Sequence, residues 1–292
     1  MNEPVDKKNL LTWIILVTLS LVWGASFFLM KKGLVAFSPP QVASLRISFS
    51  FLALLPVLIF KFRKVKREKL KWIFLSAVLG SGIPPFLFTF GLVKLDSGFE
   101  EILNSLTPLF TLLVGIIFFQ FKTRWIQIVG VLIGLTGAIM LVIANTDFEN
   151  PGELKYAFGV VMATICYGFA ANILKSKLQQ EDPLAVSSMV FFLIVPFALG
   201  ILFSTDFIHV VKTNEHAASS IAHIIILSVF GTAYSLVAYN YLIQKTNVLW
   251  ASTVTYVIPV VALMLGVSDG EPFHLIYIAG MIFILSGVYL TR

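Results

Sequence analysis

Three charged residues lie within long apolar segments of the chain, where a charge is unusual. Arg46 lies about six residues into the segment 41–60, and Glu100 and Glu101 lie about four residues into the segment 97–119. If these segments cross a bilayer, a rise of about 1.5 Å per residue puts them roughly 9 Å and 6 Å below the same surface. A lone arginine at that depth costs about 2–3 kcal/mol. We therefore expect Arg46 to pair with Glu100 or Glu101, as a gate or as an anchor for a bound carboxylate; the alternative is that Arg46 reaches the lipid headgroups and the glutamates lie in the loop.

Polar and aromatic side chains within the apolar segments are candidates to line a binding site. An amide or phenol that faces lipid costs a few kcal/mol, so these groups should face the interior of the protein. The other interpretation of each one is a hydrogen bond between helices, worth about 1 kcal/mol or less. The candidates for a site near the middle of the membrane are Trp23, Ser26, Arg46, Phe86, Phe90, Asn104, Thr107, Tyr167, Asn172, Tyr234, Tyr239, Asn240, Thr255 and Tyr256.

Several kinds of chemistry are missing from these segments. None has an Asp or Glu near its centre, so the sequence shows no membrane-embedded carboxylate of the proton-coupled kind. The four histidines lie in loops or at segment ends, and no His and Glu cluster offers ligands for a metal. One cysteine, Cys166, excludes a disulfide framework. Because no nucleophile has a base beside it, we expect no catalytic residues, no metal and no cofactor.

The composition requires a membrane. Of the 292 residues, 58% are hydrophobic and 12% are charged, and the mean hydropathy is +0.92. This composition excludes a water-soluble enzyme, a disordered chain and a nucleic-acid binder. A membrane-spanning helix needs about 20 apolar residues. We predict an all-α integral membrane protein with ten spans, at residues 10–30, 41–60, 71–92, 97–119, 125–144, 156–174, 184–203, 221–243, 249–267 and 274–291.

The distribution of Lys and Arg predicts the orientation of these spans. With the N-terminus inside the cell, fifteen of the 21 basic residues fall on the inner side and five on the outer side, and Arg46 lies within a span. Basic residues are enriched in cytoplasmic loops. The acidic loop 147–153 then falls outside. We therefore expect both termini to be cytoplasmic in the inner (cell) membrane.

The chain also contains an internal duplication, with units at residues 1–146 and 155–292. Each unit holds five spans, and an odd number inserts the second unit from the opposite side of the membrane. Such inverted repeats are typical of secondary transporters, which bind their substrate between the repeats. The matches include Trp23-Gly24 with Tyr167-Gly168, Ser38-Pro39 with Asp182-Pro183, Gly80 with Gly231, and Pro108 with Pro259.

Prolines and glycines suggest roles for particular spans. Pro108 and Pro259 occupy matching places, which favours a hinge or a broken helix over simple packing. The fifth and tenth spans carry fewer polar groups and present glycines that allow close helix approach. The sequence leaves open whether this contact lies between the repeats or between two protomers of a homodimer. The glycines are Gly130, Gly134, Gly137, Gly280 and Gly287.

These motifs resemble those of ten-span drug/metabolite transporters of the EamA type, over essentially the whole chain. The first unit carries Trp23-Gly24-Ala25-Ser26-Phe27 and Leu106-Thr107-Pro108-Leu109-Phe110. The second carries Gly231-Thr232-Ala233, residues 256–261 around Pro259, and Gly270-Glu271-Pro272. One departure is that Gln120-Phe121 stands where the family usually has Gly-Glu after the fourth span, whereas the second unit keeps Glu271.

The resemblance implies alternating-access transport of small organic metabolites, often amino acids. We expect a neutral or zwitterionic, amino-acid-like substrate, because the predicted site is aromatic and hydroxyl-rich with little net charge, and we favour export. Two alternatives stay open. A passive channel can also be built from inverted repeats, and a nucleotide-sugar carrier would call for several basic residues where Arg46 stands alone. The expected partners are a small-molecule substrate and the lipid bilayer, with no nucleic acid.

Overall fold

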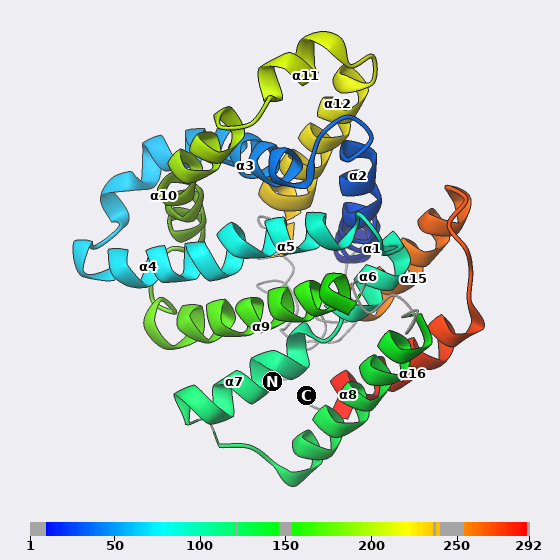
Figure 1. Cartoon of the computed structure of the whole chain (residues 1–292). Helices are drawn as coiled ribbons and strands as arrows, with labels where there is room; N and C mark the ends of the chain where they lie inside the picture. The colour runs from blue at the N-terminus through cyan, green and yellow to red at the C-terminus, as the bar shows by residue number, and fades with distance from the viewer. Residues whose placement is uncertain (1–9, 121, 146–153, 236–237, 240–253, 291–292) are drawn as a thin grey trace.

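The computed structural model describes residues 10–120, 122–145, 154–235, 238–239 and 254–290, without the side chains of residues 10, 144, 145, 255 and 256. Every regular element in these ranges is helical (Figure 1). Eight helical segments are long and apolar enough to cross a membrane, and two shorter apolar helices lie near the C-terminus. The chain is therefore an all-helical, multi-pass membrane protein.

The helices follow the predicted segments in order. The first part of the chain forms α1 (Leu10–Gly24), α2 (Ser26–Gly33), α3 (Pro39–Lys61), α4 (Leu70–Ala77), α5 (Ile83–Gly91), α6 (Ser97–Asn104), α7 (Thr107–Phe119) and α8 (Trp125–Asn145). The second part forms α9 (Leu154–Lys177), α10 (Pro183–Phe203), α11 (Phe207–Thr213), α12 (Ala217–Ser228), α15 (Val254–Ser268) and α16 (Leu275–Leu290). The short helix α11 lies in a connection that the sequence predicted as a loop.

The segment expected as one helix over 97–119 is divided in two. The helix α6 ends at Asn104, and α7 begins at Thr107 with Pro108 in its first turn. Proline has no N–H, so it cannot donate to the carbonyl four residues earlier, which is that of Asn104. The turn between the two helices is tightened instead, with the N–H of Leu106 donating to the carbonyl of Leu103 at 3.0 Å.

Two other segments contain a π-helical turn. One covers Val78–Gly82 between α4 and α5, and the other covers Val229–Tyr234 directly after α12. Such turns are rare and occur mostly as single insertions within α-helices, often at functional sites. The sequence predicted unbroken spans at both places, because the apolar pattern does not distinguish a π-turn from an α-turn.

The helices α3 and α10 lie side by side and run in opposite directions (Figure 1). At one end, the ammonium of Lys61 lies 2.6 Å from the carboxylate of Asp182. At the other end, the amide of Gln41 donates to Asp206 Oδ1 at 2.9 Å. Each helix begins with a proline, after Ser38 or Asp182, at the pair of positions that the sequence comparison had matched.

The helices α8 and α16 pack closely through glycines. A Cβ at Gly130 would lie 2.6 Å from the carbonyl oxygen of Gly287, and a Cβ at Gly137 would lie 2.6 Å from Phe283 Cβ. Only a residue without a side chain permits this approach. The glycine contact that the sequence left undecided therefore lies within one chain, between the fifth and tenth segments.

The helix α9 lies in the middle of the molecule (Figure 1). The helix α9 packs against α5 and α7, and α1 packs against α15. The largest buried cluster joins α2, α5, α6, α9 and α16 around fully buried side chains such as Phe88, Ile102 and Tyr277. This packing brings both parts of the chain to one central region, where the candidate site lies.

Candidate functional site

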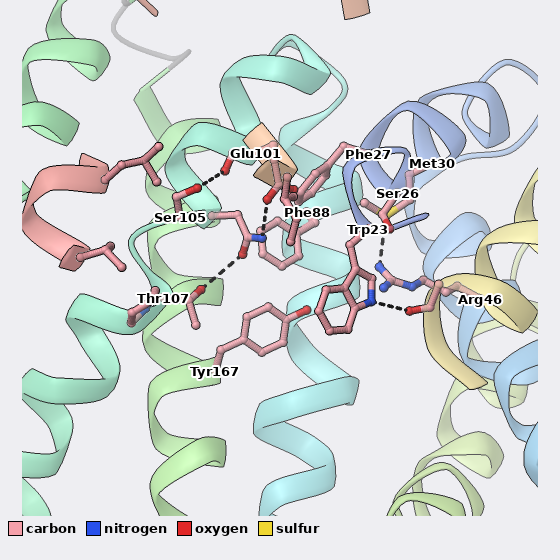
Figure 2. Close-up of a pocket in the computed structure, with 16 residues that line it drawn as sticks. Trp23, Ser26, Phe27, Met30, Arg46, Phe88, Glu101, Ser105, Thr107 and Tyr167 are labelled. Carbon is pink, nitrogen blue, oxygen red and sulfur yellow. Dashed lines mark hydrogen bonds between the residues drawn. The ribbon is translucent and has the colours of Figure 1, made fainter. Parts of the chain in front are cut away.

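Two adjoining cavities lie in the central region. Their volumes are about 400 and 430 Å³, and the first is drawn in Figure 2. Such volumes fit a small organic ligand. Both parts of the chain contribute to the lining, because α1, α3 and α7 come from the first part and α9 and the second π-turn from the other. The residues that line both cavities are Trp23, Arg46, Thr107, Tyr167 and Gly231.

Arg46 lies on α3 between the two cavities. One of its guanidinium nitrogens, Nη1, donates to the sulfur of Met30 at 3.3 Å (Figure 2). Neither Glu100 nor Glu101 lies within ion-pair distance of Arg46, so the pair predicted from their similar depths is wrong. Depth alone could not show that α6 and α3 face different parts of the cavity. The guanidinium thus faces the cavities with no carboxylate partner among the described residues.

A chain of hydrogen bonds crosses the break between α6 and α7. The hydroxyl of Thr107 donates to Asn104 Oδ1 at 3.3 Å, and Asn104 Nδ2 donates to Glu101 Oε1 at 3.3 Å. All three side chains line the first cavity, and Figure 2 labels Glu101 and Thr107 among them. Pro108 also lines it. The broken fourth span therefore presents polar groups of both helix ends to the cavity, in the manner of discontinuous helices in transporters.

The two π-turns also face the cavities. Gly80 and Ser81 of the first turn and Gly231 and Thr232 of the second line the second cavity. The indole Nε1 of Trp23 donates to the carbonyl of Gly231 at 3.1 Å. The irregular turns thus expose backbone where it lines a cavity, which is where irregular backbone is tolerated in a membrane.

A network of charges closes one end of the central region. The carboxylate of Glu271 accepts from the N–H and the hydroxyl of Ser97, which begins α6, and lies 2.6 Å from the ammonium of Lys31. Lys32 forms a second ion pair with Asp269. These contacts join α2, α6 and the connection between α15 and α16. We call this set of contacts the Glu271 latch.

Asp96 lies beside the Glu271 latch and accepts a hydrogen bond from the hydroxyl of Tyr277. Burial raises the pKa of the Asp96 carboxyl above its ordinary value, and the negative charge of Glu271 raises it further, whereas Lys31 acts in the opposite direction. The position corresponding to Glu271 in the first part of the chain is Gln120, whose φ of 56° ends α7. The second part of the chain thus has the carboxylate of Glu271 at this position, and the first part has the amide of Gln120 at the matching position.

The structure brings together about half of the residues predicted to form the site. Trp23, Ser26, Arg46, Asn104 and Tyr167 line the first cavity. Glu101 and Pro108, which were expected to act in gating, line it as well. Figure 2 shows the Tyr167 phenol pointing into the cavity toward Trp23.

Other predicted residues lie outside both cavities. Phe90 is 38% exposed and stacks on Tyr156 with ring centroids 4.6 Å apart, and Tyr234 is 40% exposed. Asn172 is buried and donates to two backbone carbonyls, those of Thr111 and Gly168, which is the structural alternative given above.

Six more predicted positions do not line the cavities or have side chains that lie outside the described residues. Tyr239 packs behind the cavity, with its ring 5.4 Å from that of Trp23. Glu100 is fully buried beside the cavity, and Pro259 lies inside the continuous helix α15. The side chain of Tyr256 lies outside the described residues, as do Asn240 and the side chain of Thr255.

Sequence reasoning missed the backbone groups and the apolar wall of the cavity. Gly80 and Gly231 had been matched between the repeats, but neither had been assigned to the site. Two signals were available: their spacing of 151, which equals that of Pro108 and Pro259, and the motif Gly231-Thr232-Ala233. Nothing in the sequence marked the apolar residues Phe27, Met30 and Phe88 as cavity lining. The face of an apolar helix that lines a cavity has the same composition as a face that packs in the core.

The sequence matches the model of the EamA-like transporter family twice, over residues 11–143 and 154–292. The chain belongs to the EamA-like transporter family. Members of this family are transporters, not enzymes. This EamA-like transporter is 27% identical over 282 residues to an uncharacterized transporter of Archaeoglobus fulgidus, covering 96% of this chain and 98% of the other.

Two further comparisons extend this result. The EamA-like transporter is 24% identical over 286 residues to a probable amino-acid metabolite efflux pump of Salmonella typhimurium, covering 92% of this chain and 91% of the other. Its fold matches a solved crystal structure with a TM-score of 0.64 and 13% sequence identity, over 96% of this chain and 95% of that one. The likeness to the solved crystal structure concerns the fold alone.

Proposed function

We propose that this EamA-like transporter is a secondary transporter that exports small, amino-acid-like metabolites across the inner membrane by alternating access. The observation that carries the proposal is Arg46, whose guanidinium faces a cavity built from both parts of the chain and has no carboxylate partner there. An arginine guanidinium can donate two parallel, charge-assisted hydrogen bonds to a substrate carboxylate, which is a bidentate interaction. The resemblance to a probable amino-acid metabolite efflux pump supports the same substrate class.

We further propose ten spans arranged as two inverted repeats, 1–146 and 155–292. Matched contacts support this arrangement. A Cβ at Gly24 would meet the side chain of Val261, and a Cβ at Gly168 would meet the backbone of Phe110. Gly24 and Gly168 are 144 residues apart, and Phe110 and Val261 are 151 apart, which are the two spacings found in the sequence. The same contact is therefore made in each half with the partners exchanged.

The π-turns support the alternating-access part of the proposal. Val78–Gly82 and the first five residues of Val229–Tyr234 are also 151 positions apart. A Cβ at Gly80 would lie 3.1 Å from Ala170, and a Cβ at Gly231 would lie 3.5 Å from Ser26 Oγ. Each half thus has one irregular turn against the first apolar segment of the other half. We assign the bending that opens each side to these turns, together with the break before Pro108.

With cytoplasmic termini, as the basic residues favour, the Glu271 latch lies on the outer side. The latch then holds the outer exit closed, and substrate enters from the cytoplasm toward the second cavity. The glycine faces of α8 and α16 are used within the chain, so they no longer argue for a homodimer.

Counterflow in liposomes tests the proposed function. Purified protein is reconstituted, the vesicles are loaded with one unlabelled amino acid at a time, and uptake of the same carbon-14 amino acid is followed. We expect saturable exchange for at least one amino acid, with a weaker apparent affinity for that amino acid in Arg46→Gln. Non-saturating flux far above carrier turnover would show a channel, and exchange of a uridine or guanosine diphosphate sugar in place of amino acids would show the nucleotide-sugar class.

A further inference from the structure

Glu101 is a carboxyl group at the wall of the first cavity, inside the membrane-spanning segment Ser97–Phe119. It is 4% exposed, and its one hydrogen bond among the described residues comes from Asn104 Nδ2. No Lys or Arg of the described chain lies within ion-pair distance of it. A membrane-embedded ionisable group without a charged partner is costly, and such groups usually mark ion or proton pathways.

Glu100, the preceding residue on α6, is also a buried carboxyl. It is 0% exposed, and neither of its carboxylate oxygens has a hydrogen-bond partner in the structure. Its Oε1 occupies the space that a Cβ at Gly91 would take, and it also lies beside Val160. Burying an ionised carboxylate without partners is strongly unfavourable. Of these two adjacent carboxyl groups, one is unpaired and the other has a single amide donor. Stabilising the fold therefore does not explain why they are there, and we expect a functional role.

The charged and titratable groups around this pair come from three of the helices packed against α6, from the connection after α15 and from the opposite wall of the cavity. They lie at different distances, and Lys31 is already paired with Glu271 in the latch. The helix α15 contains no charged residue, and the side chain of its tyrosine lies outside the described part of the chain. The groups are Lys31 from α2, Tyr167 from α9, Tyr277 and the neighbouring Asp96 at the α16 end, Glu271 from the connection after α15, and Arg46 across the cavity from α3.

We propose that Glu101, with Glu100 behind it, is a proton-binding site and that transport by this protein is coupled to proton movement. This inference rests on the proposed function. When the cavity opens to the outside, the Glu101 carboxylate takes up a proton from water and becomes a neutral carboxylic acid. When the cavity opens to the cytoplasm, the acid releases that proton and the carboxylate is restored. One proton then moves inward in each cycle, opposite to the exported substrate.

The sequence had suggested the opposite, because no Asp or Glu stands at the centre of a span. The break between α6 and α7 explains the difference. It ends α6 three residues after Glu101 and lets the cavity reach that position. A carboxyl group that is near the surface by residue count is therefore at the wall of the central cavity in the folded chain.

The test uses the full chain in liposomes with an equal mixture of carbon-14 amino acids as the probe. Counterflow is measured at equal pH on both sides, and accumulation is measured with the lumen more acidic than the medium or the reverse. We expect wild type to accumulate label when the lumen is more acidic than the medium, because protons that leave the lumen drive substrate inward, and not when the gradient is reversed. In Glu101→Gln, the ratio of gradient-driven accumulation to counterflow should fall by about tenfold or more. The exposed Glu68→Gln should keep the wild-type ratio.

A second measurement needs no variant. A pH-sensitive dye trapped in lightly buffered wild-type vesicles should report a pH change when the amino-acid mixture is added outside. If Glu101→Gln loses both activities, Glu101→Asp, which can still bind a proton, should regain gradient-driven accumulation. Three outcomes would overturn the inference and leave the proposed function standing. They are counterflow without any pH response in wild type, an unchanged ratio of gradient-driven accumulation to counterflow in Glu101→Gln, and no recovery of accumulation in Glu101→Asp. An absence of counterflow in wild type would overturn both.

Discussion

The indole Nε1 of Trp23 donates a hydrogen bond to the carbonyl of Gly231, 3.1 Å away and 208 residues later in the chain. This bond joins the end of α1 to the π-turn that follows α12, at a place where both line the cavities. In the matching place of the other half, Tyr167 stands near Gly80 in the second cavity. The two halves thus present different polar groups at equivalent positions, and only the first uses its aromatic residue to hold a π-turn.

Trp23→Phe should slow transport without preventing insertion. The substitution keeps an aromatic ring in the wall but removes the indole N–H that donates to the Gly231 carbonyl. A hydrogen bond of this kind is worth about 0.5–1.5 kcal/mol, so we expect counterflow to slow by about twofold to tenfold. Trp13→Phe, at a 52% exposed position of the same helix, is the matched control. Equal rates in both variants would show that the bond has no part in transport.

Arg46→Gln should discriminate between substrates. The variant removes the positive charge that we assign to the substrate carboxylate, and hydrogen bonds to charged groups are worth about 1.5–3 kcal/mol. We expect competition by amino acids in the counterflow assay to weaken by about tenfold to a hundredfold. Competition by amino-acid amides should change much less. If acids and amides lose affinity equally, Arg46 supports the wall and does not bind the carboxylate.

A charge exchange between Arg46 and Glu101 should fail to restore activity. The two side chains line the same cavity without forming an ion pair. Arg46→Glu should abolish counterflow, and the double variant Arg46→Glu with Glu101→Arg should remain inactive. Recovery in the double variant, measured against equal amounts of reconstituted protein, would show that the two residues meet in another state of the transport cycle.

Pro108→Ala should slow transport more than Pro259→Ala. Alanine at 108 restores an N–H that can donate to the carbonyl of Asn104, which favours a continuous helix through the break. Pro259 already lies within a continuous helix, so the same change there alters less. Pro56→Ala, inside α3 and outside both cavities, controls for the loss of a proline. The measurement is the counterflow rate per inserted protein, and equal rates for all three would reduce Pro108 to a packing residue.

Gly287→Ala should destabilise the contact between α8 and α16. The new Cβ would lie 2.6 Å from the backbone nitrogen of Gly134. Overpacking of this kind costs about 1–3 kcal/mol. Gly200→Ala is the matched control, because nothing lies within 4 Å of its Cβ position and alanine favours a helix. Thermal unfolding in detergent, followed by tryptophan fluorescence, should show a lower Tm for the first variant and an equal or higher Tm for the second.

The ion pair of Lys61 and Asp182 should make stability depend on pH. The Lys61 ammonium holds the pKa of the Asp182 carboxyl below its ordinary value of 3.8, and backbone N–H donors at the start of α10 act in the same direction. A carboxyl whose pKa is lower in the folded state adds stability above its unfolded pKa. That stability is lost as the pH falls through the folded-state value.

Asp182→Asn isolates this effect, because asparagine can still cap the first turn of α10. We expect the Tm of wild type to exceed that of the variant near neutral pH, and the difference to shrink as the pH falls below about 4. A difference that is the same at every pH would show that Asp182 acts through its cap and not through its charge.

Hydrophobicity and spacing in the sequence were enough to predict a multi-pass helical protein, the order of its apolar segments and its transporter family. These properties depend on local composition, since each span must bury its own backbone hydrogen bonds in lipid. The spacing of Trp23-Gly24 and Tyr167-Gly168 also pointed to the duplication, because repeated units keep equivalent contacts. Six of the candidate binding residues, Trp23 and Arg46 among them, line the central cavity for the same reason: a polar group in a span must face inward.

The tertiary structure alone decided which of those inward-facing groups meet. Arg46 and Glu101 have similar depths, but the angle of each side chain around its helix keeps them apart. Asn172 faces inward and binds two carbonyls in place of lining the cavity. The break before Pro108 follows from the proline itself, whereas the π-turn at Gly231 packs against a segment distant in the sequence, with Trp23 donating to the Gly231 carbonyl. Packing between helices also determines where the cavity reaches and why Glu101 lies at its wall.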